Sequence, residues 1–133
     1  MKAIIIIAFF GSLFVRAQNT VQELLADPGK YHGQVVTVKG YFINEFENIS
    51  FWDSKADEKK FKVENSLWVG SFSKDVKYLD EKGNLTEPFS LRSQVVFTAT
   101  FYCKPDTRGN KGYGHFNVWP GELGNVSVIQ KVK

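Results

Sequence analysis

The stretch PGKYHGQVVTVKGYFINEFE, residues 28–47, decides the fold of this chain. Pro28-Gly29 ends a short helix, and Gly33 makes a turn. A long strand then runs from about Gln34 to Phe46, and Gly40 falls on its inner face, where a missing side chain lets the strand bend sharply. A long, bent first strand is typical of a small, strongly curved β-barrel.

Alternation along this strand predicts which side chains face the barrel interior. The expected inner residues are Val36, Val38, Phe42 and Phe46, and the expected outer residues are Thr37, Lys39, Tyr41 and Glu45. The strand is therefore expected to bury one face and to expose the other.

Further elements follow from capping, alternation and turn residues. Thr20-Val21-Gln22-Glu23 is a capping box that begins a two-turn helix, whose apolar side we expect to cover one open end of the barrel. Polar or glycine-rich composition predicts loops over Ser54–Lys60 and Lys104–Pro120 and a mostly irregular segment over 73–92. The remaining strands are expected at Ile49–Asp53, Ser66–Phe72, Gln94–Cys103 and Asn125–Val132.

Five strands without a βαβ repeat predict an all-β fold with one short N-terminal helix. The arrangement that fits best is a five-stranded Greek-key barrel of the OB type. A small β-sandwich is the alternative, because the number of strands does not separate the two.

The first residues predict export. Lys2 precedes an apolar run from Ala3 to Val15, and Val15 and Ala17 occupy the small-residue positions before a cleavage site. We expect residues 1–17 to be a signal peptide and 18–133 to form a single domain in the periplasm or outside the cell. The apolar run is shorter than the roughly 20 residues that span a bilayer, so no transmembrane segment is expected after cleavage.

Charge and cysteine content limit the possible partners. Cleavage would remove two cations, Lys2 and Arg16, and no acid, which lowers the formal charge from +3 to +1. A nearly neutral domain argues against nucleic acid as the main partner. Cys103, the single cysteine, cannot form an internal disulfide and is expected to be a small buried hydrophobe rather than a reactive thiol.

Several motifs together resemble a family of small exported bacterial proteins of OB-like fold whose function is uncharacterised. They are Tyr31-x-Gly33, Val36-x-Val38-x-Gly40-Tyr41, Phe46-Glu47, Asn65-Ser66-Leu67-Trp68-Val69, Gly114-His115 and Gly121-Glu122-Leu123 with Asn125-Val126. The resemblance implies a fold but no activity. We expect structural roles for Tyr31, Gly33, Gly40, Gly114 and Gly121.

Glu47 and His115 are the first candidate functional pair. In an OB barrel the loops between strands one and two and between strands four and five flank the ligand face, and these loops carry Glu47 and His115. Glu47 could orient His115 or share a polar ligand with it. The alternative is that both only satisfy hydrogen bonds within their loops.

Aromatic residues form the second candidate set. Rings on the ligand face could stack on sugars, bases or an apolar peptide, although a small barrel also buries large rings in its core. The candidates are Tyr41, Trp52, Trp68, Tyr113, Phe116 and Trp119, of which we expect Tyr41 and Trp119 to be exposed.

The sequence holds no recognisable catalytic motif. The glycines at 109–114 are expected to form a hairpin tip, because no Walker pattern or helix start accompanies them. The two histidines, His32 and His115, have no spacing that ties them to carboxylates, so no metal or other cofactor is predicted. The leading hypothesis is a non-enzymatic module that binds a protein, peptide or saccharide; the alternatives are a hydrolase or lyase using Glu47 and His115, and a single-stranded nucleic-acid binder.

Overall fold

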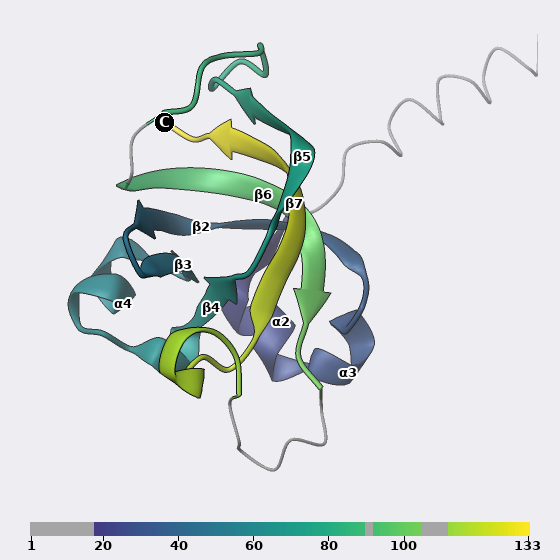
Figure 1. Ribbon diagram of the computed structural model, residues 1–133, viewed down its shortest axis with the longest axis vertical. Coiled ribbons are helices and arrows are strands. Elements are labelled where there is room, and N and C mark those ends of the chain that lie inside the picture. The colour runs from purple at the N-terminus through teal and green to yellow at the C-terminus, as the bar shows by residue number, and fades with distance from the viewer. Residues whose placement is uncertain (1–17, 90–91, 105–111) are drawn as a thin grey trace, which may run out of the picture.

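The computed structural model describes residues 18–89, 92–104 and 112–133, except for the side chain of Phe116, and it is mostly β with a few short helices (Figure 1). The predicted signal peptide lies outside the described residues. The strands are β1 (Asn19–Thr20), β2 (Val35–Glu45), β3 (Asn48–Trp52), β4 (Ser66–Val69), β5 (Phe72–Leu79), β6 (Arg92–Tyr102) and β7 (Glu122–Lys131). The helical elements are α2 (Val21–Ala26), α3 (Pro28–Tyr31), α4 (Lys55–Lys59), η1 (Val63–Asn65) and η2 (His115–Asn117).

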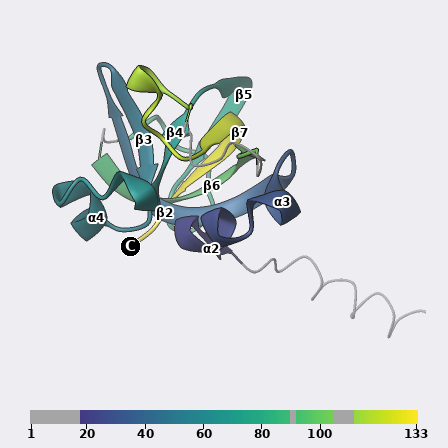
Figure 2. The same cartoon turned by 90° about the horizontal axis from the view of Figure 1, so that it is seen from below.

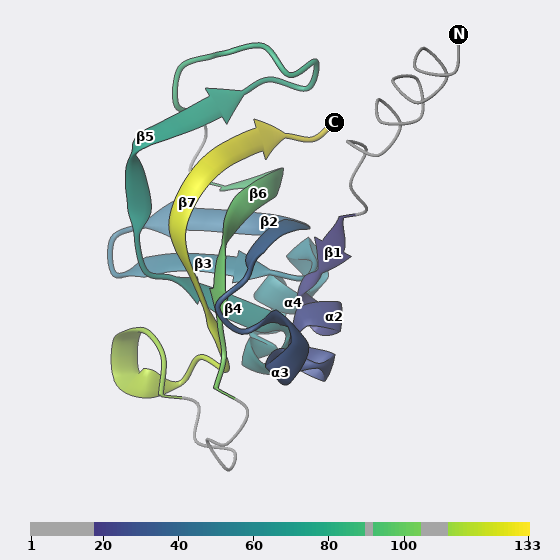
Figure 3. The same ribbon diagram turned by 90° about the vertical axis from the view of Figure 1, so that its right-hand side faces the viewer.

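All of these strands belong to one mixed sheet that closes on itself. β2 pairs antiparallel with β3 and β6, β3 pairs antiparallel with β4, and β7 joins β4 in parallel and β6 antiparallel. Two strands extend this ring in parallel register, since β1 pairs with β2 and β5 pairs with β7. Figure 3 shows α2, α3 and α4 gathered on one side of the sheet, away from β5.

The bend in β2 lies where its neighbours change. β1 pairs with β2 at Val38 and Lys39, whereas β3 begins its pairing at Tyr41. Gly40 lies between these two stretches, and a Cβ added there would overlap the Phe51 ring and the Trp52 carbonyl oxygen. The close approach of β3 therefore requires a glycine at this position.

The N-terminal helix forms as the capping box predicts. The Thr20 Oγ1 accepts a hydrogen bond from the Glu23 N–H at 3.1 Å, and the Glu23 Oε1 accepts one from the Thr20 N–H at 2.9 Å. Val21 and Leu24 of α2 are fully buried and join the main core. Pro28-Gly29 does not end helical structure as expected, because Pro28 begins the four-residue helix α3.

The main core lies inside the closed sheet. Phe97 is fully buried, and its ring centroid lies 4.8 Å from that of Phe42 and 4.7 Å from that of Phe51. Val36, Val38 and Phe42 point inward as the alternation predicts. Phe46 was expected to join them, but it is 92% exposed because β2 ends at Glu45 and Phe46 enters the turn to β3.

Three elements were missed in segments expected to be loops or irregular: β5, α4 and the short helix η2. β5 forms within the supposedly irregular 73–92 segment because it pairs with the edge of β7, although its own sequence is mostly polar. α4 lies within Ser54–Lys60, where the Ser54 Oγ accepts a hydrogen bond from the Asp57 N–H at 3.1 Å and caps the helix.

Candidate functional site

A surface hollow forms where three connecting segments meet beside the end of β2. Its volume is about 180 Å³, and we call it the turn hollow. The hollow brings together the two residues that the sequence paired, Glu47 and His115, and both side chains are exposed. The full lining is Glu47, Asn48, Phe61, His115, Val118 and Trp119.

Backbone strain is concentrated at the turn hollow. Glu47 and Phe61, which line the hollow, have φ values of 57° and 50°. Asn117, which lies between the lining residues His115 and Val118, has a φ of 54°, and these are three of the four non-glycine residues with positive φ in the described part of the chain. The left-handed conformation costs roughly 1–2 kcal/mol for a residue with a Cβ, and it is especially unusual for a bulky residue such as Phe61. Strain of this kind persists where the surrounding structure holds it, and it tends to cluster at functional sites.

The segment after α4 holds Phe61 in this conformation. The Phe61 N–H donates to the Glu58 carbonyl oxygen at 3.0 Å, and the Lys62 N–H donates to the Asp57 carbonyl oxygen at 2.9 Å. Arg92 of β6 links α4 to β2, with its guanidinium 3.1 Å from the Glu58 carboxylate and 2.8 Å from that of Glu45.

The hydrogen bonding of the Arg92 guanidinium to the Glu45 carboxylate is the main cause of a raised pKa for Arg92. Because this network is exposed, it orients α4 more than it stabilises the fold.

Behind the turn hollow lies a second apolar cluster on the outer face of β2, β3 and β4, which we call the outer cluster. Its buried members are Tyr41, Ile43, Trp52 and Trp119, and Val63, Trp68 and Tyr113 pack against them. The Trp119 ring centroid lies 5.5 Å from that of Trp52 and 5.6 Å from that of Trp68. Figure 2 shows the yellow-green segment that contains η2 beside β4.

The prediction that Tyr41 and Trp119 are exposed is wrong. Their exposed fractions are 6% and 5%, because the segment after Gly112 folds back over the outer face of the sheet and inserts Trp119. The outer face of β3 and β4, which was expected to be open for a ligand, is therefore filled by this chain's own side chains.

The polar atoms buried in the outer cluster are hydrogen-bonded, and a glycine allows the backbone to pass close to its tryptophan rings. The Trp52 Nε1–H donates to the Ser50 Oγ at 2.8 Å, and the Ser50 hydroxyl donates to the Asn48 Oδ1 at 2.8 Å. Gly114 has a φ of 67°, and a Cβ at this residue would lie 2.5 Å from the rings of both Trp68 and Trp119. Glycine is therefore required where the backbone passes these two indoles.

The predicted site residues have different positions in the structure. Glu47, His115 and Trp119 line the turn hollow, whereas Tyr41 and Trp52 lie buried beneath it. Trp68 and Tyr113 are partly buried against the outer cluster, and the side chain of Phe116 lies outside the described residues.

Sequence reasoning missed Asn48, Phe61 and Val118 in the lining of the turn hollow. Phe61 had one visible sequence cue, since it is a lone aromatic residue within the lysine-rich run Lys59-Lys60-Phe61-Lys62.

The residues given structural roles are set by backbone conformation, close approach or packing. Gly33 has a φ of 78°, and its N–H donates to the Phe101 carbonyl oxygen at 2.7 Å. A Cβ at Gly121 would approach Leu67 and the Tyr102 carbonyl oxygen at 3.0 and 3.1 Å. Tyr31 packs against the main core, with the Lys30 ammonium 5.2 Å from its ring centroid.

Cys103 is buried, and burial raises the pKa of its thiol. Its sulfur lies 3.2 Å from the Pro120 carbonyl oxygen, and its N–H donates to the Nδ1 of His32 at 3.0 Å. These features describe a packed thiol rather than a nucleophile.

The described residues contain neither a metal-binding cluster nor a membrane-spanning helix. No group of three or more His, Cys, Asp or Glu side chains could hold a metal ion there. None of the helices in the same part of the chain is long and apolar enough to cross a membrane.

Comparison with known proteins does not place this chain in a family: no family model, curated protein or solved structure matches it.

Proposed function

We propose that this chain is an exported, non-enzymatic binding module built on an OB-type barrel, and that it binds a protein or peptide through the turn hollow. The observation that carries the proposal is a hollow with exposed apolar walls in which two lining residues, Glu47 and Phe61, have a strained left-handed backbone. Backbone strain that the fold maintains around an accessible hollow favours a ligand site over an ordinary surface depression.

The strand pairing supports the OB-type assignment. The neighbours β6, β2, β3 and β4 form an antiparallel set in which a fourth strand returns to lie beside the first, which is the Greek-key order. β7 lies between β4 and β6 and closes the ring of five strands. Continuous pairing around a ring favours a barrel over two separate packed sheets.

Export is supported by the N-terminal pattern. A charged residue, an apolar run and small residues before Gln18 are the parts of a cleavable signal peptide. Among the described residues, the first strand, β1, begins just after this pattern at Asn19. The proposed location is the periplasm or the extracellular space.

The size of the turn hollow favours a protein or peptide ligand. Its volume of about 180 Å³ lies below the roughly 300–1,000 Å³ of pockets that enclose whole small molecules, so it suits one side chain of a larger partner. Phe61 and Val118 are 63% and 37% exposed, and Phe46 lies next to Glu47 in the turn. An apolar patch around a hollow is typical of an anchor site for a partner's side chain.

Catalysis by Glu47 and His115 is less well supported. The two residues share the lining of one hollow, which keeps them candidates for contact with a ligand. Both side chains are nevertheless exposed, whereas catalytic electrostatics are strongest where water is excluded. We therefore assign them to polar contacts with the partner. The near-neutral charge likewise gives no support to nucleic-acid binding.

The test compares two exposed apolar residues. Peptides are selected from a random display library on the purified protein, and their affinities are measured by fluorescence polarisation. Phe61→Ala should weaken the selected peptides about tenfold or more, as loss of an anchor contact does. Leu85→Ala removes a side chain that is 74% exposed and does not line the turn hollow, so it should leave affinity unchanged.

Several outcomes would overturn the proposal. Failure to select any peptide, or equal affinity for the wild type and Phe61→Ala, would remove the turn hollow as a peptide site. Binding to a glycan array that depends on Phe61 would replace the peptide by a saccharide. Turnover of an ester or glycoside panel that His115→Ala abolishes would make the protein an enzyme.

A further inference from the structure

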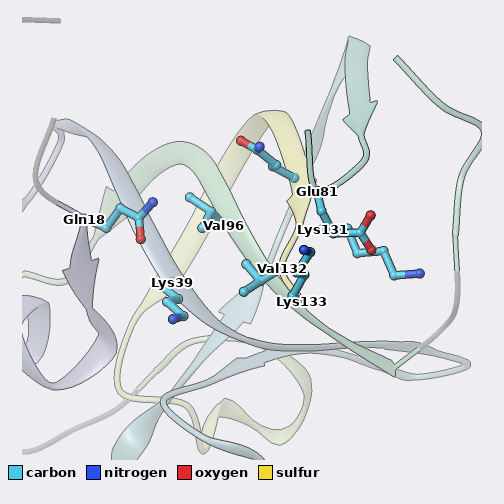
Figure 4. Close-up of a pocket in the computed structure, with 8 residues that line it drawn as sticks. Gln18, Lys39, Glu81, Val96, Lys131, Val132 and Lys133 are labelled. Atoms are coloured by element: carbon cyan, nitrogen blue, oxygen red, sulfur yellow. The ribbon is translucent and has the colours of Figure 1, made fainter. Parts of the chain in front are cut away.

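A second hollow, separate from the turn hollow, lies beside the end of β7. It has a volume of about 230 Å³ and shares no lining residue with the turn hollow, and we call it the lysine groove. Figure 4 shows Gln18 and Lys39 on one side of the groove and Glu81 and Lys131 on the other. The groove therefore joins segments from both ends of the domain.

The side chains that line the lysine groove carry an excess of positive charge. Lys39, Lys131 and Lys133 contribute three ammonium groups, and Glu81 contributes one carboxylate. The chain without its predicted signal peptide has a formal charge of only +1, so the side chains outside the groove sum to a slightly negative charge. A local excess of this kind attracts an anion.

Two of the lysine side chains are positioned by the protein itself, without a ligand. The Lys131 ammonium lies 5.8 Å from the centroid of the Phe89 ring, a cation–π contact that holds the side chain at the edge of the groove. Lys39 extends from the regular strand β2. Positioning by the scaffold lowers the ordering cost when an anion binds.

The other lining groups narrow the class of anion. The amides of Gln18 and Gln130 can both donate to and accept from hydroxyl groups, and Val96 and Val132 provide an apolar surface between the two charged sides. The Glu81 carboxylate repels anions, so it disfavours a ligand that brings two negative charges into so small a groove. A phosphate monoester carries about −1.5 to −2 at neutral pH, whereas a carboxylate carries −1.

We propose that the lysine groove binds a sugar acid, with its carboxylate on the lysines, its hydroxyls on the glutamine amides and the apolar face of its ring on the valines. The small volume suits a single ring, so in a longer acidic saccharide the groove holds one unit. This site does not depend on the peptide ligand proposed for the turn hollow.

The test is an NMR titration of the purified protein with a trisaccharide of galacturonic acid and with the corresponding neutral trisaccharide of galactose. The acidic sugar should shift amide resonances around Lys39 and Lys131, and the neutral sugar should bind at least several-fold more weakly. Lys39→Gln together with Lys133→Gln should weaken the acidic sugar about tenfold, since each exposed ionic contact contributes modestly.

The matched control is Lys55→Gln together with Lys59→Gln. These residues are the exposed ends of α4, line neither hollow and change the net charge by the same amount. Affinity for the acidic sugar should stay within twofold in this variant. An equal loss in both variants would reduce the effect to general electrostatic attraction and overturn the proposal. Absence of binding at millimolar sugar, or tighter binding of galactose 1-phosphate, would overturn it as well.

Discussion

Along the second half of β2 both faces of the strand are buried, but by different means. Its inner face packs Val36, Val38 and Phe42 against the other strands of the closed sheet. Along its second half, the outer face packs Tyr41 and Ile43 under Trp119, which comes from a connecting segment far along the chain. The closed sheet thus makes the main core by pairing with itself, whereas the outer cluster depends on a segment folding back over the sheet.

This difference predicts two levels of stability. The main core is enclosed by strands whose hydrogen bonds reinforce one another, so a space left there cannot easily be refilled. The outer cluster borders the turn hollow and is covered by irregular segments, which can move inward or admit water when a side chain is removed. Loss of the outer cluster should therefore leave the closed sheet folded.

Phe97→Ala should have the largest effect, because it removes a fully buried ring that contacts both Phe42 and Phe51. We expect the free energy of unfolding to fall by about 4 kcal/mol, as for other buried aromatic residues. Urea denaturation followed by far-UV circular dichroism measures this change. A loss below about 2 kcal/mol would show that the interior of the sheet can collapse around the missing ring.

Trp119→Ala tests the outer cluster. The variant removes the ring that lies against Trp52 and Trp68. We expect a loss of about 2 kcal/mol, below the roughly 3–5 kcal/mol typical of a buried tryptophan, because the covering segment can relax. The far-UV spectrum should be retained while tryptophan fluorescence shifts to longer wavelength. Phe46→Ala, at a 92% exposed position, is the control and should change stability by less than about 0.5 kcal/mol.

The comparison between the two faces would fail in either of two ways. A loss in Trp119→Ala as large as that in Phe97→Ala would make the two clusters one cooperative core. Loss of the sheet spectrum in Trp119→Ala would show that the outer cluster is needed for the strands to pair.

The sequence could predict the inner face because its determinants are local. Alternation from Val36 to Phe42 has the period of a strand, and Gly40 marks the bend wherever the partner strands lie. The capping box at Thr20 likewise needs no tertiary contact to be recognised.

The outer cluster could not be predicted in the same way. Tyr41 occupies an outward position in the alternation, and its burial depends on where the segment carrying Trp119 folds. β5 is similar, because pairing with the edge of β7 rather than its own polar sequence makes it a strand.

The candidate site was predictable in part. The expected strand order placed the connections that carry Glu47 and His115 on the same rim, and both residues line the turn hollow. Phe61 was missed because its exposure follows from a left-handed backbone after α4, and the sequence predicted a loop there instead of a capped helix.

Glu122→Gln should have the smallest effect on stability. The variant tests whether water reaches the outer face of the sheet beside the outer cluster. Glu122 pairs in register with Trp68, and its carboxylate occupies the space where Gly70 has no side chain, 2.5 Å from the position of a Cβ. Burial raises the pKa of this carboxyl above its ordinary value. The folded state therefore binds the proton more tightly than the unfolded state does.

A raised pKa gives a defined dependence on pH. The contribution of Glu122 to stability is fully present below the ordinary pKa of a glutamate, about 4.3, and is lost as the pH rises through the higher pKa of the folded state. Glu122→Gln should thus be more stable than the wild type at pH 7, by roughly a few tenths of a kcal/mol because the side chain is only half-buried. This advantage should disappear below about pH 4.

Urea denaturation at several pH values, with the exposed Glu64→Gln as the control for net charge, measures the difference. An advantage that is the same at every pH, or is matched by Glu64→Gln, would mean that water reaches Glu122 freely and that the dry region ends at Trp68.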